Sequence, residues 1–249
     1  MADVRWIDRA LQRIIDLTNA STGSAYATRI FQGLAHIDGS GLKFKRFARA
    51  STKGELGDLN AELTFALLFA GLDFDVVFEP TGDKGPDLSV RRDGQSAYVE
   101  VKRFRPRERV RAETVTMTDE PLLFQQYGQP EKDTDKVRGE LYAKLRQVAG
   151  HNGILAIWSD DDDLEFLEHR FAGDDMRRDS EKGVQRVPEN VLFSVFAGNW
   201  RSGRTGQQVY CRPFRPLADP FRMWAEDLDL VSVSSCVREA LKKLSAQDV

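Results

Sequence analysis

The chain has 249 residues, enough for one large domain or two small ones with a substantial buried core. Hydrophobic residues make up 41% and charged residues 30% of the chain, which excludes a largely disordered protein. The formal net charge of −3 excludes a globally basic protein, so any contact with nucleic acid must come from local patches.

The cysteines and histidines argue against a zinc protein. Cys211 and Cys236 lie far apart without metal-ligand spacing, and there are only three histidines. The low cysteine content fits a reducing setting, so a cytoplasmic location is expected. The N-terminus has no apolar signal region and no segment reaches about 18 consecutive apolar residues, so we expect no membrane partner.

Residues 1–50 are expected to form an N-terminal helical extension. Apolar residues recur at helical spacing over 6–17 and over about 24–36, and 38–41 has the composition of a loop. The run 43–49 alternates cations with aromatic residues. Such a run either touches a phosphate backbone or forms the solvated face of a helix or strand, which is the commoner case.

The strongest predicted helix spans 57–71, with Asp58 as its N-cap and Gly71 as its end. Its apolar stripe indicates that it is well buried. Glu62 lies inside this apolar helix. It is either exposed beside Asp58 on a narrow polar side or else paired or metal-associated, because an isolated buried carboxylate is uncommon.

A strand at 74–78 is followed by a predicted hairpin, with strands over 85–90 and 97–102 and Asp93-Gly94 at the centre of its turn. With this loop, Arg92 faces Gln95 and Asp87 lies directly opposite Glu100. Their Cβ atoms are then roughly 4.5–5.5 Å apart on one face. The two-residue period of a strand adds Lys102 to that face. The other face is apolar and collects Leu88, Val90, Ala97, Val99 and Val101.

Two directly opposed carboxylates destabilise a sheet, so their pairing calls for a reason. A divalent cation is the obvious one, because Mg²⁺ prefers carboxylate oxygens. The Lys102 ammonium would then orient a metal-bound water or stabilise developing negative charge.

The segment after Lys102 is long, irregular and basic. It is interpreted either as a contact surface for a polyanion or as a solubilising surface loop. Its arginines are Arg103, Arg105, Arg107, Arg109 and Arg111. A helix over 133–149 and an apolar central strand over 154–158 follow. The expected core, 52–160, is therefore a helix, three strands, a helix and a strand.

Residues 161–249 are expected to form a C-terminal α/β extension that completes the sheet. The acidic cluster 160–163 either binds a cation or starts a solvated helix, which is the commoner case. We expect a short helix at 164–171, a loop over 173–188, strands at 191–197 and 207–212, and a closing helix at 234–244. The patterns give this part no functional interpretation.

With these residues in view, the chain resembles the PD-(D/E)XK nuclease superfamily. The resemblance covers about 110 residues and rests on Pro86-Asp87, Glu100-Val101-Lys102 and Glu62 on the preceding helix. It implies a single α/β domain with a restriction-endonuclease-like mixed sheet flanked by helices (αβββαβ core).

The resemblance also implies roles for individual residues. Asp87 and Glu100 would bind Mg²⁺, with Mn²⁺ as a substitute, helped by Glu62 and the carbonyl of Val101. Lys102 would assist the attacking water. The resemblance does not choose among Lys136, Lys144 and Gln147 as a further site residue on the following helix. Nucleic-acid contacts are expected from Arg103, Arg105, Arg107, Lys136 and Lys144.

The leading hypothesis is therefore a Mg²⁺-dependent nuclease that hydrolyses phosphodiester bonds, with DNA as the expected substrate and an endonuclease dimer as one arrangement. The second hypothesis is a non-catalytic nucleic-acid- or protein-binding member of the same fold. The third is an ordinary α/β protein in which Glu100 and Lys102 form a surface ion-pair ladder.

Overall fold

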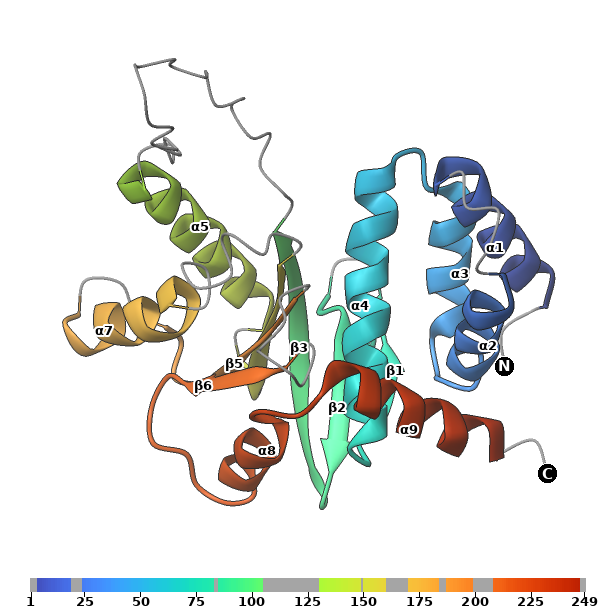
Figure 1. The fold of residues 1–249 in the computed structure, drawn as a ribbon. Helices are drawn as coiled ribbons and strands as arrows, with labels where there is room; N and C mark the ends of the chain where they lie inside the picture. Colours follow the sequence, from blue (N-terminus) through green and yellow to red (C-terminus); the bar gives the residue numbers. More distant parts are fainter. Residues whose placement is uncertain are drawn as a thin grey trace, which may run out of the picture.

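The computed structural model describes residues 4–18, 24–82, 85–104, 130–148, 150–159, 170–183, 187–198 and 208–246. Their framework is one mixed six-stranded sheet with helices on both faces (Figure 1). The strands lie in sequence order across the sheet: β1 (Asp75–Phe78), β2 (Leu88–Arg92), β3 (Gln95–Phe104), β4 (Gly153–Ser159), β5 (Val191–Gly198) and β6 (Tyr210–Pro213). This arrangement confirms the predicted α/β class with a mixed central sheet.

Three N-terminal helices, α1 (Val4–Thr18), α2 (Ser24–Leu34) and α3 (Ser40–Arg49), form an outer layer beside the long helix α4 (Lys53–Gly71). The predicted loop 38–41 is wrong at its end, because α3 already begins at Ser40. α4 also begins earlier than expected: its N-cap is Thr52, whose side chain accepts a hydrogen bond from the Glu55 backbone N–H. Asp58 therefore lies inside the helix, whereas the predicted end at Gly71 is confirmed.

The hairpin of β2 and β3 has the predicted register. Arg92 pairs with Gln95 and Leu88 with Val99, around a turn in which Asp93 and Gly94 have φ values of 53° and 75°. Positive φ at both central residues is the geometry of a type I′ turn, whose twist matches that of the strands. The predicted apolar face is buried in one hydrophobic core, formed by Leu88, Val90, Ala97, Val99 and Val101.

The two faces of the sheet carry separate hydrophobic cores. α4 packs on the face of Val99 and Val101 together with the N-terminal helices. The helix α5 (Pro130–Leu145), followed by a 3₁₀ turn (Arg146–Val148), covers the opposite face and buries Leu141 and Leu145 against β3 and β4. β4 is buried along its whole length, as predicted for a central strand, between parallel neighbours β3 and β5.

The C-terminal part continues the sheet, because β5 pairs with β4 and β6 pairs with β5. The predicted loop 173–188 is wrong in part, since it contains a π-helical segment (Arg170–Asp175) and α7 (Met176–Glu181). The sequence interpretation also missed α8 (Phe221–Leu228). The closing helix α9 (Val233–Ser245) packs against α4 and α2. The acidic cluster 160–163 lies outside the described residues.

Among the helices that the structure describes, none combines the length and the apolar character needed to cross a membrane.

Candidate active site

Asp87 and Glu100 lie on the same face of the sheet. Asp87 comes directly before β2, and the Leu88–Val99 pair beside it places it opposite Glu100. One oxygen of Asp87, Oδ2, accepts a hydrogen bond from the Val101 backbone N–H at 2.8 Å, which ties the carboxylate to β3. The Asp87 and Glu100 carboxyl groups also lie within hydrogen-bonding reach of each other. The two acids therefore face each other across neighbouring strands, as predicted.

Glu62 approaches these acids from α4. The side chain is only 14% exposed and forms an ion pair with Lys43 of α3, so it is a paired carboxylate rather than an exposed one beside Asp58. Lys43 is fully buried, and its Nζ also lies 2.8 Å from Oε1 of Glu79, which Arg46 contacts at 2.6 Å. A buried ionic network therefore holds Glu62 in place from behind.

The helix α5 supplies the partners of Glu100. Lys144 forms an ion pair with the Glu100 carboxylate, whose side chain is 1% exposed. The amide of Gln147, oriented to donate, lies 2.7 Å from Glu100 Oε2. Of the three residues that the sequence left open on this helix, Lys144 and Gln147 thus contact Glu100. The side chain of Lys136 lies outside the part of the chain that the structure describes.

Lys102 lies two residues beyond Glu100 on β3 and binds a different acid. Its Nζ is 2.7 Å from Oε2 of Glu140, on α5. The third hypothesis, a surface ladder of Glu100 and Lys102, is therefore wrong: Glu100 is buried and each residue pairs with α5 instead.

Arg103 packs against the first turns of α4. Its Nη1 donates to the Gly54 carbonyl at 3.1 Å and lies 3.2 Å from Asp58 Oδ1, and the side chain is 13% exposed. This places Arg103 in a contact between β3 and α4. The expected nucleic-acid contacts Arg105 and Arg107 lie outside the described residues.

The acids influence one another electrostatically. Burial, with the negative charge of Asp87, raises the pKa of Glu100 to about 8 despite Lys144. Burial and Asp87 also raise the pKa of Glu62 to about 7, against the opposing effect of Lys43. Burial alone would lower the pKa of Lys144. The negative charges of Glu100, Asp87 and Glu62 outweigh the effect of burial, so the pKa is raised. Glu62, Asp87, Glu100 and Lys144 therefore form one electrostatic unit, which marks a candidate functional site.

The donor set suits a hard cation bound partly by the protein. Within the described ranges, no group of three or more His, Cys, Asp or Glu side chains is arranged to hold a metal. Asp87 and Glu100 nevertheless offer two facing carboxylates, and Mg²⁺ in proteins is often held by one or two carboxylates plus waters and substrate phosphates. The residues therefore fit a magnesium ion at the Asp87–Glu100 pair.

Sequence reasoning missed three residues of this site: Lys43, Glu140 and Glu79. The first two had a detectable signal. Lys43 precedes Phe44 and stands four residues before Phe47, both buried, so it lies near the inner side of α3. Glu140, Lys144 and Gln147 recur at helical spacing toward the sheet. Glu79 had no signal, because its pairing depends on how α3 lies over β1.

Comparisons with known proteins give no relative: no family model matches the chain, and no curated protein or solved structure does so.

Proposed function

We propose that this protein is a Mg²⁺-dependent nuclease of the PD-(D/E)XK type, with a restriction-endonuclease-like fold, that hydrolyses phosphodiester bonds, with DNA as the expected substrate. The observation that carries the proposal is the facing pair of Asp87 and Glu100, with Glu62 coupled to it from α4. A helix, three strands, a helix and a strand deliver these groups in the order that the resemblance implies.

Each side chain has a distinct task in this proposal. Asp87 and Glu100 hold Mg²⁺, helped by Glu62 and the Val101 carbonyl, and the ion supplies Lewis acidity and an activated water. Lys102 faces the phosphate and balances the charge that builds on it, while Glu140 holds the ammonium in position. Lys144 stabilises the ionised form of Glu100 until a cation arrives.

The direct test is cleavage of supercoiled plasmid and of single-stranded DNA with Mg²⁺ or Mn²⁺. We expect the wild type to cleave and Asp87→Ala to lose cleavage together with its metal ligand. Lys102→Ala should lose about 10²–10³-fold in rate, as removal of a charge-stabilising group typically does. Asp93→Asn, which keeps a residue suited to the positive φ of that turn, and Lys182→Ala change exposed residues; they are the controls and should cleave normally.

Equal cleavage by all five proteins would identify a contaminating nuclease and refute the catalytic assignment. Folding of each variant is checked by circular dichroism, so that a lost fold is not mistaken for lost chemistry.

One observation favours the second candidate, a non-catalytic binding member of the same fold. Lys43 and Lys144 already form ion pairs with Glu62 and Glu100, so two of the three acids have a cationic partner without a metal. Binding of DNA by a well-folded wild type that neither cleaves nor takes up Mg²⁺ would establish this candidate in place of the nuclease.

A further inference from the structure

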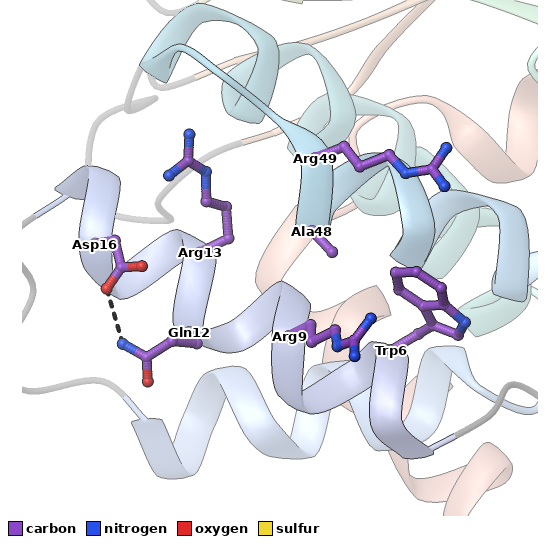
Figure 2. A pocket seen from close by; sticks show the side chains of 7 residues that line it. All are labelled: Trp6, Arg9, Gln12, Arg13, Asp16, Ala48 and Arg49. Atoms are coloured by element: carbon purple, nitrogen blue, oxygen red, sulfur yellow. Dashed lines mark hydrogen bonds between the residues drawn. The ribbon is translucent and has the colours of Figure 1, made fainter.

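A second polar surface lies on the N-terminal helices, away from the carboxylates. α1 and α3 enclose a shallow hollow of about 480 Å³ (Figure 2). Three arginines dominate its lining, Arg9 and Arg13 from α1 and Arg49 from α3, and the indole of Trp6 stands at one end. This hollow is separate from every residue assigned above to the metal and its phosphate.

The cations of this surface gather around one aromatic ring. Arg9 lies 5.0 Å, Lys45 5.8 Å and Arg49 6.0 Å from the centre of the Trp6 ring. In the described part of the chain, none of these three cations has a carboxylate partner. By contrast, most lysines and arginines around the candidate active site do have one. The one acid of the lining, Asp16, accepts a hydrogen bond from Gln12 at 2.8 Å (Figure 2).

Several unpaired cations held together repel one another, so the arrangement favours an anion as the missing partner. Guanidinium groups bind phosphate and carboxylate oxygens alike through paired hydrogen bonds, so the arginines alone do not choose between the two anions. An aromatic ring among the cations is the combination that contacts both backbone and bases in strand-binding grooves. The tryptophan among the cations is thus the feature that favours a nucleic-acid strand over an acidic protein segment.

The position of the hollow links it to the proposed active site. Arg13 Nε donates to the carbonyl of Ala50 at 2.5 Å, in the turn just before α4. Arg103, at the end of β3 that follows Glu100 and Lys102, donates to Gly54 in the first turn of the same helix. The hollow and the end of β3 therefore flank the same end of α4, and one strand crossing that end would contact both.

We propose that the hollow of Trp6, Arg9, Arg13 and Arg49 is a sequence-independent binding site for the phosphate backbone of a nucleic-acid strand. This inference deepens the proposed nuclease function by giving it an anchoring surface outside the catalytic carboxylates.

The test measures binding of a labelled duplex oligonucleotide, and of one of its strands, by fluorescence anisotropy over a series of salt concentrations. All proteins carry Asp87→Ala and the buffer contains EDTA, so cleavage plays no part. Arg9→Ala/Arg49→Ala removes two hollow cations. Arg177→Ala/Arg238→Ala removes two exposed cations elsewhere, on α7 and α9, and is the control for net charge. Thermal unfolding verifies that both variants are folded.

We expect the hollow variant to bind more weakly and to lose about 0.9 from the slope of log K against log salt for each duplex phosphate contact, or about 0.7 for a single strand. The control should keep the wild-type slope. Equal affinity and slope for the hollow variant would overturn the proposal.

Two further probes separate a nucleic-acid site from a general anion site. Poly-glutamate and inorganic phosphate are each tested as competitors of the labelled oligonucleotide. If either displaces it as effectively as unlabelled oligonucleotide does, the assignment is overturned in favour of an acidic protein or a free phosphate. The binding result does not depend on nuclease activity. Loss of binding in the hollow variant would support the binding site even if the wild type cleaved nothing. Unchanged binding would refute the binding site and leave the nuclease proposal untouched.

Discussion

The buried carboxylate site and the exposed hollow handle charge in opposite ways. Between α4 and α5, every acid of the site has a partner within the protein: Lys43 holds Glu62, the Val101 N–H holds Asp87, and Lys144 holds Glu100. In the lining of the hollow the arginines outnumber the single acid, Asp16, and Arg9 and Arg49 contact a tryptophan rather than a carboxylate.

The difference follows from burial. A charge removed from water must be paired, because desolvation costs several kcal/mol. An exposed cation keeps its hydration, so it is stable without a partner and can bind an anionic ligand. Removing a partner should therefore damage the fold at the carboxylate site and leave the fold intact at the hollow.

The largest stability effect is expected for Lys43→Met. The substitution leaves Glu62 and Glu79 buried without their shared ammonium, and breaking a buried pair in this way typically destabilises a protein by about 3–5 kcal/mol. Urea unfolding measures the loss. Lys45→Met, two residues along the same helix and partly exposed, is the control and should be nearly silent. A Lys43 variant as stable as wild type would show that the network is not needed to hold Glu62.

A smaller effect, dependent on pH, is expected at Glu100. Because the folded pKa is raised to about 8 from 4.5, the fold favours the protonated carboxyl, and this stabilisation is lost as pH rises through about 8. In EDTA the free energy of unfolding should thus fall as pH rises from about 5 to 8, by up to about 1.4 kcal/mol for each pKa unit.

Glu100→Gln should flatten that pH dependence and stabilise the metal-free protein at pH values above the raised pKa. Urea unfolding at a series of pH values measures both effects. The remaining slope should come from Glu62, whose pKa is also raised. An unchanged slope in Glu100→Gln would mean that Glu100 is not confined beside Asp87.

The smallest effect is expected for Arg49→Gln. The side chain is exposed and has no ion pair in the described structure, so the free energy of unfolding should change by less than about 0.5 kcal/mol. A loss as large as that of Lys43→Met would show that the hollow is a structural element and would remove the contrast between the two regions.

Local rules predicted the parts of the site that depend on local geometry. The two-residue turn at Asp93-Gly94 sets the hairpin register, and the register alone brings Asp87 opposite Glu100. The start of α4 was misplaced because Asp58 is a good N-cap residue, yet Thr52 and Glu55 form the capping pair that the chain uses.

The parts that depend on packing between distant elements could not be predicted. Helical spacing places Lys43 near the inner side of α3, but its acidic partners, Glu62 and Glu79, depend on how that helix lies over α4 and β1. The partner of Lys102 is Glu140, 38 residues away, and only the placement of α5 on the sheet brings them together. Pairings of this kind are tertiary, and no period in the sequence encodes them.

The most direct test of the account is calorimetric titration of the wild type and Asp87→Asn with Mg²⁺, with Asp93→Asn as the control. The account predicts that the wild type and the control bind Mg²⁺, that Asp87→Asn does not, and that wild-type affinity falls as pH decreases from about 8, because protons compete for Glu100. Absence of binding to the folded wild type, or equal binding by Asp87→Asn, would contradict the central claim that Asp87 and Glu100 form a metal site.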